Sequence, residues 1–311
     1  MNNKVRKEVT YFEIKNENVD QRLDNFLLTK LKKITRPEVY KLIRTGQVRV
    51  NSGRIKPSYR LQLGDKVRIP PFSLSTEKSK TPKQGVLDLI ESRIAYENDS
   101  FIVLNKPSGF AVHGGSGIQF GVIEAIRHLR PHAPFLELVH RLDRETSGCL
   151  LIAKTRKSLL HLHKLLREET LTKIYYALVV GKWRGPKKVV MPLNKNQLKS
   201  GERVVKVDSE GKEASTKFKI LRQFEDCTLL EAMPITGRTH QIRVHAAFMG
   251  HPIIGDDKYG DKKINKEFSQ RGIQRLFLHA YSITIPQLEG KSETYICELD
   301  ATLQNILEQL G

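Results

Sequence analysis

The sequence predicts an α+β protein with a small basic N-terminal domain and a larger domain built on a mixed or antiparallel β-sheet flanked by helices and loops. Charge is the first observation: residues 1–85 carry 20 Lys and Arg against 8 Asp and Glu, a net +12 of the +19 for the whole chain. The second is a stretch with few large apolar residues at 71–92. After it, strand-like runs outnumber helical ones, without the alternation of a βαβ fold.

The small domain is expected at residues 20–80, after an N-terminal extension at 1–19. Its first helix is predicted over 20–33, where apolar residues recur on one helical face and Asp20 stands as a cap. The apolar residues of that face are Leu23, Phe26, Leu27 and Leu31.

A second helix is expected to follow. Thr35 and Glu38 have capping-box spacing, a proline lies in the first turn, and Gly46 marks the end. The runs "VRVN" and "LQLGDKVRIPP", separated by an "NSG" turn, then predict short strands. Two short helices leading into a basic hairpin thus make a compact module.

Residues 71–92 are predicted to be mostly linker, and residues 93–311 the larger domain. Helices are expected at 121–129 and 155–169. The strand-like runs are "FIVLN", "LELV", "GCLLIA", "IYYALVV", "TLLEAMPI" and "LFLHAYSITIP".

Composition narrows the class of protein. A pI near 9.8 indicates a polyanionic partner, with nucleic acid the natural reading and a merely soluble basic protein the alternative. No apolar run approaches the roughly 20 residues of a membrane-spanning helix, and the N-terminus lacks a secretory apolar core. The three cysteines are far apart without a CxxC motif, so we expect a reducing cytoplasm and neither a disulfide framework nor a zinc site.

The stretch "HRLDRETSG" at 140–148 follows a predicted strand and sets Asp143 among cations. Nearby positive charge favours the ionised form of a carboxyl group, which suits a nucleophile or a charge stabiliser. Gly148 permits a tight or left-handed turn. The alternative is an Asp–Arg ion pair that only pins a loop, and these nine residues do not decide between the two.

A second motif, "PITGRTHQIRVHAAFMGHPIIGD", begins at residue 234. It places Arg238 and Arg243 near the beginning of one helix, where cations oppose the helix dipole. A local anion is therefore expected, either Asp143 or a phosphate. His240 and His245 are five residues apart, which is not the i, i+4 spacing of a zinc-binding helix.

Two further stretches concern the substrate. In "KIYYALVVG", strand alternation sends Tyr175 and Tyr176 to opposite faces, one to the core and one to a cleft or solvent. An aromatic ring facing a cleft can stack on a base, although ordinary packing is an equal alternative. The stretch "LNKPSGFAVHGGSG" at 104–117 is no P-loop and is expected to be a flexible loop lining the substrate.

Together, "NKPSG", "HRLDRETSG", "KIYYALV" and "GRTHQIRVH", in this order, resemble the RluA-type pseudouridine synthases. The front module, with "RLDNFL" and "RTGQVRVNSGRIKPSYRLQLGDKVRI", is similar to the S4 RNA-binding domain. The resemblance implies an enzyme that breaks the N1–C1′ bond of a uridine in 23S rRNA, turns the base and joins C5 to C1′. It implies no metal or organic cofactor and a cytoplasmic, monomeric protein.

The resemblance also implies residue roles. Asp143 would be the catalytic aspartate, Arg243 its partner, Tyr175 the residue packed on the target base, and Arg141 the side chain that fills the gap left by the extruded uridine. Whether Asp143 attacks C1′, attacks C6 or abstracts a ribose proton stays open. Further RNA contacts are expected from His140, Arg144, Arg238, Gln241, Lys106, Arg44, Arg49, Arg54 and Lys56.

Two other functions compete with this one. The first is a non-catalytic rRNA-binding or ribosome-assembly factor on the same scaffold, in which the surroundings of Asp143 would have decayed. The second is a phosphoryl-transfer enzyme, which would need a phosphate loop and paired acidic metal ligands. The sequence has neither of these, and Asp143, Tyr175 and Arg243 are all present.

Overall fold

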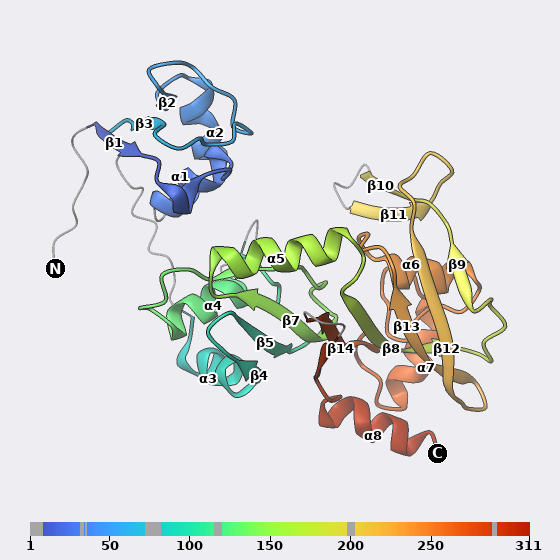
Figure 1. Ribbon diagram of the computed structural model, residues 1–311. Helices are drawn as coiled ribbons and strands as arrows, with labels where there is room; N and C mark the ends of the chain where they lie inside the picture. The colour runs from blue at the N-terminus through green and yellow to red at the C-terminus, as the bar shows by residue number, and fades with distance from the viewer. Residues whose placement is uncertain are drawn as a thin grey trace. The chain divides into compact units, whose positions relative to one another are not determined.

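The computed structural model describes residues 9–31, 34, 36–71, 82–114, 120–197, 203–287 and 291–311. The chain divides into two compact units between Thr81 and Pro82 (Figure 1). Each unit has its own hydrophobic core. Within the described part of the chain, no helix is both long and apolar enough to cross a membrane.

The first unit combines two helices, a short 3-10 helix and a three-stranded antiparallel sheet of order β1-β3-β2. Its elements are β1 (Thr10–Glu13), η1 (Asn16–Asn18), α1 (Leu23–Lys30), α2 (Arg36–Arg44), β2 (Arg49–Val50) and β3 (Lys66–Ile69). The four apolar residues predicted for the face of the first helix are all buried, which confirms that face.

The start of this unit differs from the sequence expectation in two ways. Residues 10–13, predicted to be part of an extension, form β1 because Phe12 packs edge-on against Phe26 and its backbone pairs with β3. Helix α1 begins at Leu23 and not at residue 20. Asp20, predicted as its cap, has a left-handed backbone and pairs with Arg60 at 3.0 Å. Thr35, predicted to cap the second helix, lies outside the described residues.

The second unit is built on one large sheet of order β4-β5-β7-β14-β8-β13-β12-β9, with β6 on β7 and β15 on β14. All pairs are antiparallel except β7 with β14. The strands are β4 (Ile94–Glu97), β5 (Phe101–Lys106), β6 (Glu137–Leu138), β7 (Ser147–Ala153), β8 (Thr172–Val180), β9 (Lys188–Val190), β10 (Leu193–Gln197), β11 (Arg203–Val207), β12 (Ser215–Gln223), β13 (Cys227–Pro234), β14 (Leu278–Pro286) and β15 (Ser292–Ile296). Strands β10 and β11 form a separate two-stranded antiparallel sheet.

Helices pack on both faces of this sheet, and Figure 1 shows α5 and α8 on opposite sides of its central strands. The helices are α3 (Gln84–Ser92), α4 (Val122–Leu129), α5 (Arg156–Arg167), α6 (Gln241–Phe248), α7 (Lys262–Gln270) and α8 (Ala301–Gln309). Helices α4 and α5 match the predicted ones, and Thr155 caps α5 by accepting a hydrogen bond from the Ser158 N–H at 3.0 Å. The α+β class is thereby confirmed.

The predicted linker at 71–92 is wrong over its last nine residues, which form α3. This helix is amphipathic, and its Leu87 and Ile90 are buried in the core of the second unit. A few apolar residues are enough to pack α3 against the core, because they recur at helical spacing on one face of the helix.

Strand β8 separates two regions of the core. Its Tyr175 side packs against Ile242 and Ala246 of α6. Its Tyr176 side packs against residues of α7 and α8, and the Tyr176 ring stacks on Tyr281 with centroids 4.1 Å apart. The predicted alternation of the two tyrosines is confirmed, and α6 lies on the face that carries Tyr175.

Candidate active site

Asp143 lies in the loop that leads into β7, a strand buried along its whole length. The Thr146 N–H donates to the Asp143 carbonyl oxygen at 3.2 Å, which closes a turn around the carboxylate. Thr146 and Ser147 are buried, whereas the Asp143 side chain keeps 19% of its surface exposed. The turn therefore presents one carboxylate at the rim of a rigid strand.

Gly148 is required where this loop enters the sheet. Its φ is +104°, and a Cβ atom would lie 2.2 Å from the carbonyl oxygen of Ala280. Ala280 is its partner in the parallel pairing of β7 with β14. Only glycine allows the two strands to approach this closely with this backbone, so Gly148 fixes where the Asp143 loop ends and β7 begins.

A second loop, residues 106–110, is bound to the Asp143 loop. The Lys106 ammonium, which is completely buried, donates to the carbonyl oxygens of Pro107, Phe110 and Arg144 at 2.8–3.0 Å. The Gly109 N–H donates to the same Arg144 carbonyl at 2.9 Å. Burial lowers the pKa of Lys106 to about 7. All three ammonium hydrogens of Lys106 have backbone acceptors, so this structure leaves no free donor for the RNA contact expected of it.

Buried polar groups support the Asp143 loop from the other side. The Arg275 Nη2 donates to Ser147 Oγ at 2.7 Å, and Ser147 Oγ lies 2.9 Å from His279 Nδ1. The His279 Nε2 is 2.7 Å from the Cys297 carbonyl oxygen, so it carries the proton and Ser147 donates to Nδ1. Burial lowers the pKa of His279 to about 4. This neutral imidazole anchors the first residue of β7.

Arg243, on the first turn of α6, reaches Asp143 but is held mainly by another carboxylate. Its Nε and Nη2 donate to the two oxygens of Asp256 at 2.8 Å each, and its Nη1 is 3.4 Å from Asp143 Oδ2. Burial would lower the pKa of Arg243, but the two carboxylates keep it above its usual value. The guanidinium stays charged and is aimed at Asp143 by a bidentate pair.

Asp256 is itself fixed by the turn that contains it. Its Oδ1 accepts the backbone N–H groups of Lys258 and Tyr259 at 2.9 and 3.0 Å. Burial would raise the pKa of Asp256, but Arg243 and these N–H groups hold it below its usual value. This buried carboxylate therefore remains an anion and supplies the partner that a cation near the start of α6 needs.

Tyr175 lies on the same side of the sheet as α6 and is half-buried. Its cross-strand neighbours, Ala232 and Ala280, are small. Burial, together with the negative charge of Asp143, raises the pKa of the Tyr175 phenol. The structure thus brings Asp143, Arg243 and Tyr175 into one neighbourhood from a loop, a helix and a strand.

The residues beside Asp143 in sequence have different surroundings. The His140 Nε2 accepts the Leu151 N–H at 3.1 Å, and burial lowers the pKa of His140 to about 3. His140 is therefore a neutral ring whose Nε2 is used by the backbone, and the RNA contact expected of it stays a prediction. Arg141 is exposed, and its side chain makes no hydrogen bond or ion pair to any described residue. Arg144 is exposed and donates to the Gly109 carbonyl at 3.1 Å.

The other two residues expected to contact RNA lie before and at the start of α6. Arg238, in the turn before the helix, is exposed, and its Nε donates to the Glu213 carbonyl oxygen at 3.0 Å. Gln241 is buried, and its amide donates to the Ser215 carbonyl and to Thr216 Oγ1 at 2.9 Å each. These two bonds join α6 to β12 and use the amide donors from which an RNA contact was expected.

In the first unit, the four expected RNA-binding cations Arg44, Arg49, Arg54 and Lys56 are all exposed. Three of them line one cavity of about 490 Å³. These are Arg44, Arg54 and Lys56. A concave basic surface of this kind fits a phosphate backbone.

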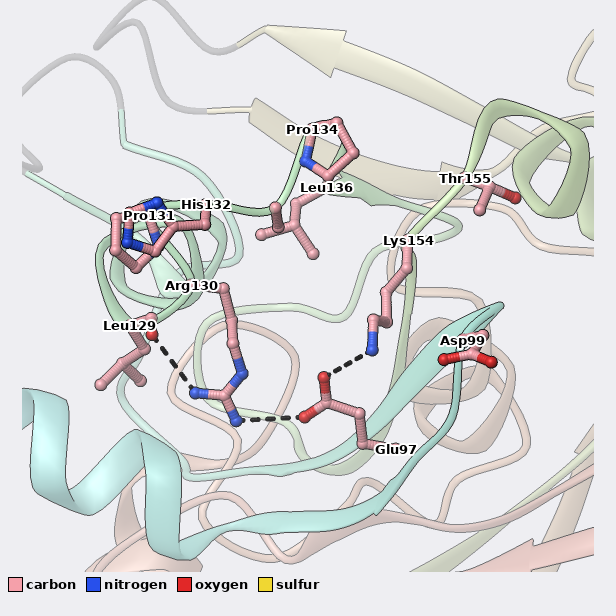
Figure 2. A pocket seen from close by; sticks show the side chains of 11 residues that line it. Glu97, Asp99, Leu129, Arg130, Pro131, His132, Pro134, Leu136, Lys154 and Thr155 are labelled. Atoms are coloured by element: carbon pink, nitrogen blue, oxygen red, sulfur yellow. Dashed lines mark hydrogen bonds and ion pairs between the residues drawn. The ribbon is translucent and has the colours of Figure 1, made fainter.

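Another cavity, of about 470 Å³, lies beside the end of α4 (Figure 2). At its base Glu97 accepts from Lys154 at 2.8 Å and from Arg130 at 3.1 Å, as the dashed lines in Figure 2 show. Burial would raise the pKa of Glu97, but the two cations hold it below its usual value. Charges here are compensated internally, which distinguishes this cavity from the Asp143 site.

Sequence reasoning missed Asp256, Tyr259 and a role for His240 at this site. The signal that could have found the first two is the run "IIGDDKYGD", where glycines flank an acidic turn. A Cβ atom at Gly255 would lie 2.1 Å from the Arg275 carbonyl oxygen, so this turn packs directly against the backbone at Arg275. Elsewhere, within the described residues, no three His, Cys, Asp or Glu side chains group as metal ligands.

Comparison with known proteins places these features in context. Residues 100–248 match the family model described as RNA pseudouridylate synthase, and residues 21–67 match the S4 domain. Ribosomal large subunit pseudouridine synthase C of Haemophilus influenzae is 50% identical over 98% of this chain and 96% of that protein. The protein of the same description from Vibrio cholerae is 48% identical over 99% of each chain. The solved structure of human RNA pseudouridylate synthase domain containing 4 superimposes with a TM-score of 0.59 at 27% identity, over 73% of this chain and 95% of that one.

Proposed function

The chain belongs to the RluA-type family of RNA pseudouridine synthases, and we propose that it isomerises uridines of 23S ribosomal RNA with Asp143 as its catalytic residue. It is an enzyme of ribosomal RNA modification, with an S4 domain in front of the synthase domain. The large-subunit substrate is proposed because relatives about 50% identical over nearly the whole chain carry that description.

The observation that carries the role of Asp143 is its environment. It is a partly exposed carboxylate at the end of a buried strand, and a buried Arg243 reaches it at 3.4 Å. Because Asp256 already fixes the position of the guanidinium, Arg243 can stabilise the ionised Asp143 without a tight ion pair that would occupy both oxygens of Asp143. A loop that needed only a pinning ion pair would not require the second carboxylate.

A carboxylate in this position suits a reaction at a glycosidic carbon. When the N1–C1′ bond breaks, positive charge develops at C1′, and an ionised carboxylate beside it lowers the energy of that state. Asp143 can attack C1′, attack C6 of the base, or abstract a ribose proton. Each of these steps needs the same two properties, an ionised group and a fixed aim, and Arg243 supports both.

The target uridine must leave its stack to reach Asp143. Extruding a base costs a few kcal/mol, and stacking on an aromatic ring offsets part of that cost. Tyr175, between two alanines and close enough to sense the charge of Asp143, is proposed to pack on the base. Arg141, exposed and without a partner among the described residues, is proposed to fill the gap in the RNA.

The proposal also covers cofactors, oligomeric state and the place of action in the cell. Every step uses a carboxylate, a guanidinium and a phenol, so the reaction as proposed needs no metal ion or organic cofactor. Asp143, Arg243, Asp256 and Tyr175 come from one chain, which supports a monomeric enzyme. The two relatives described above are bacterial proteins with the description ribosomal large subunit pseudouridine synthase C, which supports the cytoplasm as the place of action.

The experiment is a map of pseudouridines in ribosomal RNA from cells with and without this protein, by carbodiimide modification and primer extension. We expect one or more stops in 23S rRNA to disappear without the protein and to return when its gene is restored. A 23S map that is identical with and without the protein would refute the substrate assignment. A non-catalytic assembly factor would leave the stops in place.

A further inference from the structure

Asp143 has a second neighbour besides Arg243, and it approaches the other carboxylate oxygen. The His240 Nε2 lies 3.7 Å from Asp143 Oδ1, whereas the Arg243 Nη1 lies 3.4 Å from Oδ2. Both distances are longer than a good hydrogen bond, as is common for catalytic groups before the substrate is bound. The His240 side chain is only 16% exposed, so the contact is not a surface pair.

The other nitrogen of His240 is held by a tyrosine. Tyr259 Oη and His240 Nδ1 are 2.6 Å apart, and the backbone N–H of Val205 donates to Tyr259 Oη at 3.1 Å. The Val205 bond uses one lone pair of the Tyr259 oxygen and leaves the phenol proton available; with the phenol as donor of the 2.6 Å contact, Nδ1 is the acceptor. A neutral imidazole that accepts at Nδ1 carries its hydrogen at Nε2. The hydrogen at Nε2 then faces Asp143.

One turn supplies the support for both neighbours of Asp143. Residues 256–259 contain Asp256, which holds Arg243 with two hydrogen bonds, and Tyr259, which holds His240. The Tyr259 N–H also donates to Asp256, so the two supports are linked. His240 has a left-handed backbone, with φ of 54°, immediately before α6.

We propose that His240 is a positioning residue for the isomerisation: its Nε2–H holds Oδ1 of Asp143, Tyr259 fixes the required tautomer, and Arg243 holds Oδ2. The proposal rests on the catalytic role proposed for Asp143. Two donors, one on each oxygen, restrict rotation of the carboxylate in a way that Arg243 alone does not. Burial keeps the pKa of His240 below its usual value against the pull of Asp143, so the ring donates without adding a second full charge.

The test compares substitutions that remove one nitrogen at a time. His240→Asn keeps a polar group near Nδ1 and suits the left-handed backbone, but it removes the donor at Nε2. His240→Gln places an amide near Nε2 instead. Tyr259→Phe removes only the hydroxyl that fixes the tautomer, and Tyr281→Phe removes a hydroxyl on the other face of the sheet as the matched control.

The readout is release of tritium from a 23S rRNA transcript labelled at C5 of uridine, which requires no knowledge of the target site. For His240→Asn we expect kcat to fall by about 10- to 100-fold, the range for one hydrogen bond to a charged group, with KM within about threefold. His240→Gln should recover part of kcat, Tyr259→Phe should lose about threefold or more, and Tyr281→Phe should match the unsubstituted enzyme.

A kcat for His240→Asn within twofold of the unsubstituted enzyme, or a loss confined to KM, would overturn the positioning role. An equal loss in the Asn and Gln variants would overturn it too, since only space filling would then matter. If the unsubstituted enzyme itself released no tritium, the proposed function would fail, and the two failures are therefore distinguishable. Should His240→Asn not fold, the comparison of Tyr259→Phe with Tyr281→Phe decides the matter alone.

Discussion

Arg243 is paired more closely with Asp256 than with Asp143. It makes two hydrogen bonds of 2.8 Å to Asp256, which is completely buried, and one contact of 3.4 Å to Asp143. The buried Arg243–Asp256 pair therefore holds the guanidinium in place. The longer contact to Asp143 is the one that can tighten when substrate binds. An arginine bound equally to both carboxylates would have to break a strong pair during the reaction.

The first prediction concerns the buried pair of Arg243 and Asp256. Asp256→Asn removes the charge that holds Arg243, and breaking a buried pair on one side destabilises a protein by about 3–5 kcal/mol. We expect the urea midpoint to fall and kcat to fall by about 100-fold, because Arg243 loses its aim at Asp143. Asp257→Asn, the exposed neighbour in sequence, is the matched control and should change neither quantity. A stable Asp256→Asn enzyme with normal kcat would contradict this account.

The second prediction separates chemistry from binding. Asp143→Asn keeps the shape of the side chain and removes its charge, so tritium release from labelled 23S transcript should fall by about 1,000-fold or more. Affinity for the same transcript, measured by filter binding, should stay within about threefold, since a single carboxylate adds little to the phosphate contacts that dominate binding. Comparable losses of both would indicate that Asp143 organises the RNA-binding surface and is not the reacting group.

The third prediction tests the close approach of β7 and β14. Gly148→Ala puts a Cβ atom 2.2 Å from the Ala280 carbonyl oxygen at a φ of +104°, so a strand must shift. We expect a loss of about 3 kcal/mol or more of stability, together with lower kcat, because Asp143 moves with β7. Gly250→Ala is the control: it has a φ of +82° with no atom within 4 Å of the added Cβ. It should cost about 1 kcal/mol. Similar losses in the two variants would mean that backbone conformation, and not the clash, decides the effect.

The fourth prediction is a pH dependence of stability. Burial lowers the pKa of His140 to about 3 and of His279 to about 4, well below the 6.5 expected in the unfolded chain. Between pH 6.5 and 4 the unfolded state therefore binds more protons, so stability is present above pH 6.5 and is lost as pH falls. Each histidine should contribute up to about 1.4 kcal/mol per pH unit.

The check on this pH dependence is a series of urea denaturations between pH 7 and 4.5. His279→Gln keeps a hydrogen-bonding side chain but cannot titrate, so its stability should fall less steeply with acid than that of the unsubstituted protein. An unchanged slope in His279→Gln would exclude His279 as a source of the acid sensitivity.

Local sequence patterns predicted individual helices and strands of this protein and the faces of their side chains. Long-range contacts, which no local pattern shows, determine what surrounds each site residue. The alternation in "KIYYA" was enough to send Tyr175 and Tyr176 to opposite faces. The sequence predicts RNA contacts for Lys106 and Gln241 because both belong to basic, polar motifs, whereas the fold buries their side chains against backbone carbonyls. Asp256 was missed for a similar reason: 13 residues separate it from Arg243, and no local period connects a turn to the helix before it.

The last prediction concerns the first unit, which holds 19 of the 53 Lys and Arg residues but only 8 of the 34 Asp and Glu. Deletion of residues 1–81, which leaves α3 with the second unit, should weaken binding to a 23S transcript by about 10-fold or more at 0.1 M salt. Because fewer counterions are released, the plot of log affinity against log salt concentration should also become less steep. The full-length triple variant Arg44→Gln, Arg54→Gln and Lys56→Gln should reproduce part of both effects, because it removes three of the four cations that line one cavity and keeps the fold. Unchanged affinity and slope in the deletion at several salt concentrations would exclude the first unit from RNA binding, and a full effect in the triple variant would locate the binding at that cavity.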